Sequence, residues 1–416
     1  MENRLAIELE AMLKEAQPSF STQSCCIYKV PHSIRKLNED AYTPVLVSIG
    51  PLHHGNPRLV TMEAHKQFCC NNFIQRSKAS LNDLVSCVQQ LEPRIRACYS
   101  EKINLTADKL VEVIFIDCCF VIELFLEDKL MIDDSIFSKA WMSNRVEHDL
   151  KLLENQVPLF VFEDIYKLAF PSLLDNGYTS FMCLVFACFS SYNKQKFLPP
   201  AASSILHFTD LLRYFCLPQS IIRRNPGLLV LGHGASELVE GRVKFVENKA
   251  SHGCMLALEF KDGTLSIPHI EVGDGYEIWL RNMVALEQCH YPLKHYILDY
   301  VVFLGHIMET SKDAGVIIKA GIINCIVGGG NYESSVAKLF GDVWKETLAA
   351  NTNDDYLKIC DDLNKYYNKN HPGYCKIATL RREYFTNRWK TIASIAAIVL
   401  LILTFIQTVC SILQVK

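Results

Sequence analysis

The chain has 416 residues, half of them apolar, and its 42 Lys and Arg against 45 Asp and Glu leave a formal net charge of −3 at pH 7. This composition excludes a disordered chain and offers no global basic surface, so we expect no nucleic-acid partner. The 17 cysteines include adjacent pairs rather than a spaced framework, which predicts small buried hydrophobes in a reducing compartment rather than disulfides.

Residues 1–25 predict a mobile tail without a targeting signal. Charged residues recur every few positions, so the segment lacks the apolar centre of a signal peptide. Leu5, Leu9 and Leu13 could line one face of a short helix, but Pro18 and the polar residues after it favour a linker. We therefore expect the body of the protein in the cytosol.

The domain that follows is organised around residues 26–66, whose sequence is CIYKVPHSIRKLNEDAYTPVLVSIGPLHHGNPRLVTMEAHK. Proline and glycine recur among its apolar residues, so it cannot be one helix. The pattern predicts extended backbone pinned by turns, leading into a helix near Arg58. Gly50 and Pro51 are expected to form a strained turn that the surrounding domain holds in place.

Helical periodicity dominates the next hundred residues. Pro93 is expected in the first turn of a separate helix, a position that tolerates its missing N–H. Residues 107–130 are apolar nearly all round, which predicts a buried helix. Asp117 and Glu123 make that helix a poor membrane span and lie six positions apart, so we expect each to be paired separately with another group.

A break between two helices is predicted just before Pro158. Glu154, Asn155 and Gln156 lie there between apolar runs, and their side chains can satisfy the backbone groups that such a break leaves free.

The period of the pattern changes near residues 240–270. Short runs of alternating residues predict strands, the last two joined by a tight turn at Asp262 and Gly263. We therefore expect a small antiparallel sheet inserted in a helical protein. Helices resume at Tyr276, and two more are expected near 332–350 and 354–368.

The carboxy-terminal segment predicts a membrane anchor. Residues 391–415 contain no charged side chain, and a helix of this length can cross a bilayer. We place the transmembrane helix at 391–413. The preceding segment, 376–390, is basic and is expected to stay on the cytosolic side. The expected protein is single-pass and tail-anchored, with the lipid bilayer as one partner.

The best candidates for chemistry lie in the first motif. His53, His54, Glu63 and His65 are residue types that bind zinc, but their spacing does not match a zinc-binding helix. Histidines that tie the loop to the core by hydrogen bonds are the expected role. No nucleophile elbow and no phosphate-binding glycine motif occurs in the sequence, so we predict no catalytic residue, metal or cofactor.

Several segments resemble the plant family known as domain of unknown function 247, whose members are called UPF0481 proteins. The similarity covers residues 26–415 and includes IYKVP, VSIGP, the His-His-Gly triplet, LLENQVPLFV and LRNMVALEQ. It implies a link to self-incompatibility recognition in grass pollen and, more loosely, to development and defence. The motif residues that we single out on this basis are Pro31, Gly50, Pro51, His53, His54, Gly55, Glu63, Glu154, Asn155, Gln156 and Pro158.

The predicted fold class is mainly α. It comprises one helical cytosolic domain over 26–375 with a small antiparallel sheet near 240–270, a basic juxtamembrane segment over 376–390 and a transmembrane helix over 391–413. The predicted function is a membrane-anchored recognition module with an unknown protein partner. The alternative is a membrane-anchored hydrolase that uses the region of His53, His54 and Glu63.

Overall fold

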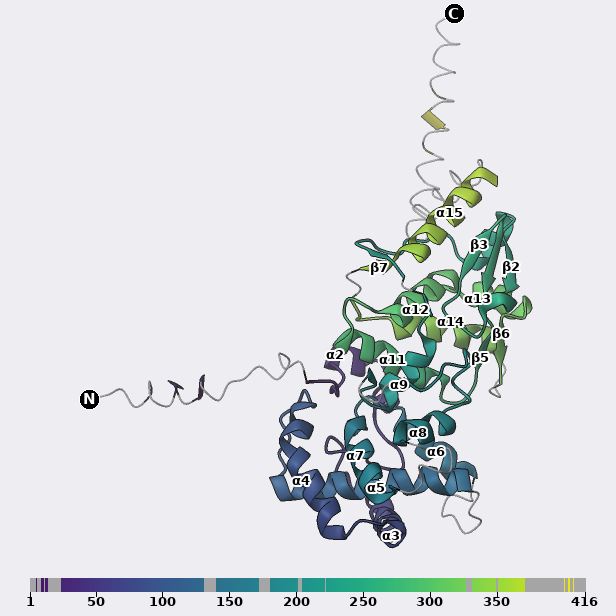
Figure 1. The fold of residues 1–416 in the computed structure, drawn as a ribbon. Coiled ribbons are helices and arrows are strands. Elements are labelled where there is room, and N and C mark those ends of the chain that lie inside the picture. Colours follow the sequence, from purple (N-terminus) through teal and green to yellow (C-terminus); the bar gives the residue numbers. More distant parts are fainter. Residues whose placement is uncertain are drawn as a thin grey trace, which may run out of the picture.

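Helices form the frame of the molecule, and three small sheets lie among those of its second half (Figure 1). The computed structural model describes residues 24–130, 140–171, 180–200, 204–220, 222–326, 331–348 and 351–370, with isolated positions towards both ends of the chain. The larger of two apolar clusters extends through these residues from Cys26 to Tyr367, and the smaller joins the beginning of the chain's first motif to Ala285 and Leu286.

The first half is built around one long buried helix, α5 (Ala107–Leu130), which packs against α3, α4, α7 and α8. It is apolar nearly all round because neighbours cover it on several sides. Its two predicted carboxylates are paired separately, Asp117 with Lys66 and Glu123 with Arg76, as expected. The helices of this half are α2 (His32–Arg35), the 3-10 helix η2 (Glu39–Tyr42), α3 (Val60–Arg76), α4 (Leu81–Ala97), α6 (Ala140–Leu150), α7 (Leu159–Ala169), α8 (Phe181–Cys188) and α9 (Phe208–Cys216).

The prediction for Pro93 was wrong, because this residue lies inside α4 rather than at the start of a new helix. A proline within a helix removes one backbone hydrogen bond and usually bends or breaks the helix. Here the helix continues to Ala97, and Ile95 in its last turn is buried in the core.

In the second half, α11 packs against α9, α12, α14 and η2, and so joins the two halves of the chain. Its middle positions, from Leu280 to Glu287, are all buried. The helices of this half are α10 (Ala235–Glu240), the 3-10 helix η6 (Lys249–Ser251), α11 (Tyr276–His290), α12 (Tyr296–Ile307), α13 (Ser311–Lys319), α14 (Tyr332–Val343) and α15 (Asp354–Asn370).

A sheet lies where one was predicted, but its strands are mixed in direction. The hairpin of β3 (Glu259–Lys261) and β4 (Thr264–Ile267) is antiparallel, and both residues of its turn, Asp262 and Gly263, have positive φ, as a tight hairpin requires. The third strand, β2 (Lys244–Glu247), pairs with β4 in parallel, so the prediction of an antiparallel sheet was wrong for this strand. The sequence pattern indicates strands but not their directions, which depend on how the intervening chain packs.

Two further pairs of strands connect distant parts of the chain. β5 (Ile270–Val272) runs parallel to β6 (Ile323–Cys325), and β1 (Arg224–Asn225) runs antiparallel to β7 (Thr352–Asn353). These strands are only two or three residues long, so periodicity could not have indicated them.

The predicted membrane anchor is corrected by the structure. No helix within the described part of the chain is long and apolar enough to cross a membrane. The transmembrane helix predicted over 391–413 and the single-pass membrane localisation built on it are therefore not supported. The prediction relied on the length of an uncharged apolar run in the sequence. All of 376–390, and most of 391–413 and of the tail 1–25, lie outside the described residues.

Candidate functional site

Part of the backbone of the first motif, residues 26–66, is held by a carboxylate that lies about 100 positions later in the chain. We call residues 26–66, together with the segment from Asp149 to Pro158, the motif region. Asp149, near the end of α6, is almost fully buried. Its two oxygens accept hydrogen bonds from three successive backbone N–H groups, those of Val45 at 3.0 Å, Leu46 at 2.7 Å and Val47 at 2.8 Å. Burial raises the pKa of Asp149, and the three N–H donors oppose that shift. The segment therefore needs no sheet partner to satisfy these donors.

Asn155 extends the same clamp by one more residue. Its Oδ1 accepts from the Ile49 N–H at 2.7 Å, and its Nδ2 donates to the carbonyl oxygens of Val47 at 3.1 Å and Asp149 at 2.9 Å. One buried amide thus binds both the motif loop and the end of α6. Polar side chains that satisfy free backbone groups were expected at the break before Pro158, and Asn155 is one of them.

At Gly50 the loop turns away, and a buried ion pair fixes the turn. The Gly50 N–H donates to Asp117 Oδ2 at 2.8 Å. The other Asp117 oxygen lies 2.6 Å from Lys66 Nζ, which also donates to the Ser48 carbonyl oxygen at 3.0 Å. Gly50 has a φ of +78°, and a Cβ there would overlap the carbonyl oxygen of Gln156. Burial raises the pKa of Asp117, while the Lys66 ammonium opposes the shift.

Glu154 holds the beginning of the motif region. Its Oε1 accepts from the Val30 N–H at 2.8 Å and from Arg35 Nη1 at 2.6 Å. Its Oε2 lies 3.3 Å from His53 Nε2, within range of an ion pair but without hydrogen-bond geometry. This carboxylate therefore joins three segments of the chain.

Gln156 lies in the connection between α6 and α7. Its side chain hydrogen-bonds to the backbone just before it and to the beginning of α9. Its Nε2 donates to the carbonyl oxygens of Leu150 and Leu152, each at 2.7 Å. Its Oε1 accepts from the Phe208 N–H at 3.0 Å, and its own carbonyl oxygen accepts from the Tyr99 hydroxyl at 2.9 Å. We call this set of contacts, centred on Asp117, Asp149, Glu154, Asn155 and Gln156, the motif clamp.

The histidines and the glutamate of the first motif have different partners. His53 approaches Glu154, whereas Glu63 pairs with Lys66 at 2.7 Å. Nδ1 of His54 is buried and has no hydrogen-bond partner. Across the described ranges, no group of three or more His, Cys, Asp or Glu side chains could hold a metal ion.

The remaining motif residues shape the backbone. Pro31 and Pro158 each directly precede a helix, α2 and α7 respectively, where a proline leaves no helical hydrogen bond unmade. Pro51 follows the turn at Gly50. Gly55 has a φ of +81° and open space around it.

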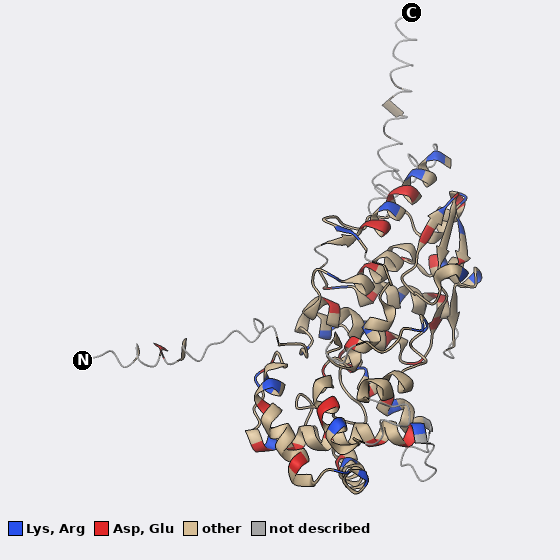
Figure 2. Ribbon diagram, in the orientation of Figure 1, with Lys and Arg blue, Asp and Glu red and all other residues tan. Residues whose placement is uncertain are grey.

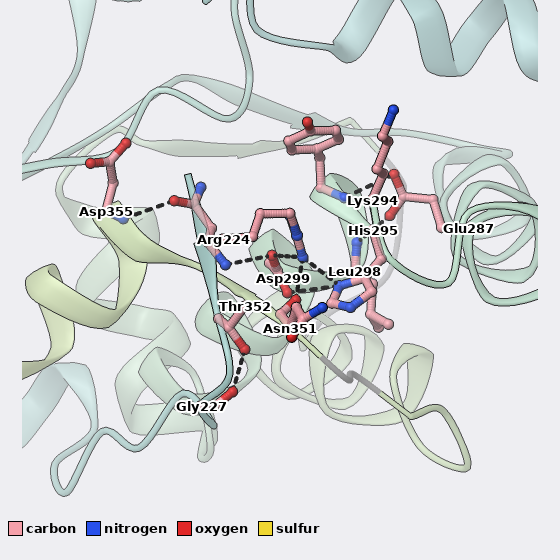
Figure 3. A network of polar contacts seen from close by, with 12 residues as sticks. Arg224, Gly227, Glu287, Lys294, His295, Leu298, Asp299, Asn351, Thr352 and Asp355 are labelled. Atoms are coloured by element: carbon pink, nitrogen blue, oxygen red, sulfur yellow. Dashed lines mark hydrogen bonds and ion pairs between the residues drawn. The ribbon is translucent and has the colours of Figure 1, made fainter. Parts of the chain in front are cut away.

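A second buried network, which the sequence analysis missed, connects α12 to the short strands β1 and β7 (Figure 3). Asp299 Oδ2 accepts from Arg224 Nη2 at 2.7 Å and from the Asn353 N–H at 3.0 Å. The other Asp299 oxygen lies 2.9 Å from His295 Nδ1. The spacing of four between His295 and Asp299 is a signal that could have indicated this pair. Arg224 has no such signal, because it lies 75 positions from Asp299.

A groove of about 870 Å³ is lined in part by Val45, whose backbone the motif clamp binds. Its walls come from the segment between η2 and Val45, from Asn56 and Arg58, from the beginning of α11 and from α14. Val45 is 61% exposed at its edge, although its backbone N–H is bound by the clamp. The charged side chains in the wall are of both signs: Asp40, Arg58, Arg145, Asp274 and Glu277.

Comparison with known proteins places this motif region in a wider set of plant sequences. The family model DUF247, described as "Plant protein of unknown function", matches residues 27–403. The chain is 28% identical over 427 residues to the UPF0481 protein At3g47200 of Arabidopsis thaliana, which covers 95% of this chain and 88% of that protein. It is 22% identical over 498 residues to the putative UPF0481 protein At3g02645 of the same plant, with 96% and 92% covered. No solved structure matches the chain.

Proposed function

Since the chain belongs to DUF247, a plant family of unknown function whose model spans residues 27–403, we propose that it is a recognition protein that binds a partner polypeptide rather than catalysing a reaction. The observation that carries this proposal is the groove of about 870 Å³ beside the motif clamp. The groove is bordered by a loop whose backbone donors are already satisfied from within the protein.

The motif clamp supports binding because it leaves a rigid surface. The side chains of Asp149, Asn155 and Gln156 are occupied by backbone groups of the same molecule. A loop fixed before its partner arrives loses little conformational entropy on association. Its outer side chains, such as Val45, remain free for contact.

The chemistry of the groove suits a protein partner. Apolar side chains, including Ile278 and Leu339, lie among charges of both signs, a mixture typical of a protein interface. Figure 2 displays Lys and Arg interspersed with Asp and Glu over the described helices rather than gathered on one face. A polyanion would instead require a concentrated basic surface.

Among the described residues, no contact favours the hydrolase that the sequence left as the alternative. His53 and Glu63 have separate partners, and neither they nor His54 line the groove. A hydrolase would need a general base within hydrogen-bond reach of a bound substrate.

The test places a photo-crosslinking amino acid at Val45 in the full-length chain, expressed in its native plant tissue. The matched control carries it at Val230, which is 65% exposed and does not line the groove. We expect one discrete crosslinked protein from position 45 and none from position 230. Equal crosslinking from both positions, or none from either, would overturn the proposal.

A second arm addresses the hydrolase. The triple variant with alanine at His53, His54 and Glu63 is expected to fold, to give the same crosslink and to keep its activity in cells. A variant that folds and crosslinks but fails in cells would replace binding with catalysis as the function.

A further inference from the structure

A separate cavity of about 750 Å³ lies between the end of α6, α9, the β2–β3 connection and the beginning of α11. Its volume is in the range of small-molecule sites in proteins. Apolar and aromatic side chains form much of its wall, among them Leu212, Phe215, Met255 and Trp279. It meets the groove only along residues 273–275, which line both hollows.

Four residues that line this cavity each carry a buried polar atom without a hydrogen-bond partner. The atoms are the hydroxyls of Tyr276 and Tyr300, Nε1 of Trp279 and Nδ1 of His148. Folded proteins leave few such atoms, because each costs the free energy of its lost hydration. Tyr300 is fully buried, so water at the surface does not compensate it. The concentration of four around one cavity makes these atoms candidate partners for a bound molecule.

The donor set limits what that molecule can be. An indole N–H only donates, so its partner must be an acceptor, and tyrosine hydroxyls can donate to the same kind of atom. Tyr276 and Trp279 have ring centroids 5.5 Å apart and present aromatic surface. Aromatic side chains favour stacked or edge contacts with other flat rings.

We propose that this cavity binds a flat aromatic small molecule whose oxygen acceptors pair with the donors of Tyr276, Trp279 and Tyr300. The charges at the wall include both Lys151 and Glu247, so the ligand is recognised by its rings and acceptors rather than by a large net charge. The proposal rests on this cavity alone and holds whether or not the groove binds a protein.

The probe is 8-anilinonaphthalene-1-sulfonate, an aromatic molecule with oxygen acceptors, titrated into the full-length chain. Binding is followed by energy transfer from tryptophan, and we expect one saturable site per chain. The variant Tyr300→Phe removes only the unpaired hydroxyl. It is expected to weaken binding about 5- to 30-fold, the effect of one hydrogen bond, without lowering the Tm of the free protein.

Tyr356→Phe is the matched control. Tyr356 is also buried, but its hydroxyl donates to the Leu256 carbonyl oxygen at 2.7 Å, and it does not line the cavity. This variant should lower the Tm and leave probe affinity unchanged. If Tyr300→Phe instead lowers the Tm as much as Tyr356→Phe and leaves affinity unchanged, the hydroxyl has a structural role and the proposal fails.

A blocking variant tests the location independently. A Cβ at Gly273 meets no atom within 4 Å, so Gly273→Leu can extend into the cavity without a clash at its first carbon. Gly341 in α14 is equally open but does not line the cavity, so Gly341→Leu is the control. We expect the first variant alone to abolish saturable binding. Unchanged binding in both variants, or probe binding that never saturates, would overturn the site.

Discussion

Gly50 and Gly55 have almost the same backbone conformation, with φ of +78° and +81°, but different surroundings. A Cβ at Gly50 would overlap the Gln156 carbonyl oxygen, whereas one at Gly55 meets nothing within 4 Å. The pair therefore separates two costs of a side chain, backbone strain at both sites and a steric clash at one.

We predict that Gly50→Ala lowers the free energy of unfolding more than Gly55→Ala. Strain alone should cost about 1 kcal/mol at Gly55, since alanine disfavours positive φ. At Gly50 the clash adds to this and weakens the Gly50 N–H bond to Asp117, for a total of about 3 kcal/mol or more. Chemical denaturation of both variants measures the difference, and equal losses would contradict the role given to Gln156.

Single residues of the candidate site were predictable only where the sequence carried a local signal. The proline and glycine pattern indicated the turn at Gly50, and the polar run before Pro158 indicated groups that bind backbone. The contact of Lys66 with Asp117 and that of Asp149 with Leu46 gave no such signal, because the two residues of each pair lie 51 and 103 positions apart. Only the fold brings these charges to the loop that they hold.

At the scale of elements, His207 connects the beginning of α9 to the motif region. Its Nδ1 faces the Asp210 N–H at 3.3 Å, and its Nε2 lies 3.0 Å from the Cys26 carbonyl oxygen. A backbone N–H can only donate, so Nδ1 accepts and the proton sits on Nε2. A second proton on Nδ1 would break the cap of the helix. Burial lowers the pKa of His207 to about 4, with the Asp210 charge and the bond to Cys26 opposing.

This lowered pKa predicts a loss of stability in mild acid. The unfolded chain takes up the proton below about pH 6.5, whereas the folded chain resists it down to about pH 4. The free energy of unfolding should therefore fall across this range, by about 3 kcal/mol from this group alone. His207→Asn keeps a capping oxygen without the titration, so its stability should fall less between pH 7 and 4.5.

Denaturant midpoints at each pH give the comparison. His252→Asn, at an exposed loop, is the control and should follow the parent protein. Identical pH profiles for His207→Asn and the parent would show that another group carries the acid sensitivity.

Helices were the most predictable elements, and strand pairings the least. The apolar run 107–130 became α5 with the same bounds, because a fully apolar helix has few alternatives once buried. The parallel pairing of β2 with β4 was missed because a strand pattern does not determine which neighbour is chosen. The continuation of α4 through Pro93 shows packing overriding a local breaker.

For the whole molecule, the sequence predicted the family and the mainly helical class correctly. The resemblance seen in the motifs is confirmed by the family model over residues 27–403. The predicted membrane anchor is not supported, since no helix within the described part of the chain is long and apolar enough to cross a membrane. That prediction relied on composition at one end of the chain.

The cysteines give a probe of the whole fold. Nine of the fifteen described cysteines are buried, none is fully exposed and none forms a disulfide. Burial raises the pKa of several thiols, those of Cys69 and Cys360 to about 12, and so keeps them as unreactive thiols near neutral pH. At most eight of the 17 cysteines should then react quickly with Ellman's reagent in the native chain, and all 17 in guanidinium. Rapid labelling of all 17 without denaturant would mean that the core opens readily.

The two segments that the motif clamp joins are synthesised at different times. A ribosome adds the residues from Val45 to Ile49 between 102 and 108 positions before it adds their partners Asp149 and Asn155. Until then the amides of the nascent loop lack these side-chain acceptors. The loop therefore takes its native shape only after the segment with Asp149 and Asn155 has emerged. The synthesis of that later segment determines when the surface beside the groove first forms.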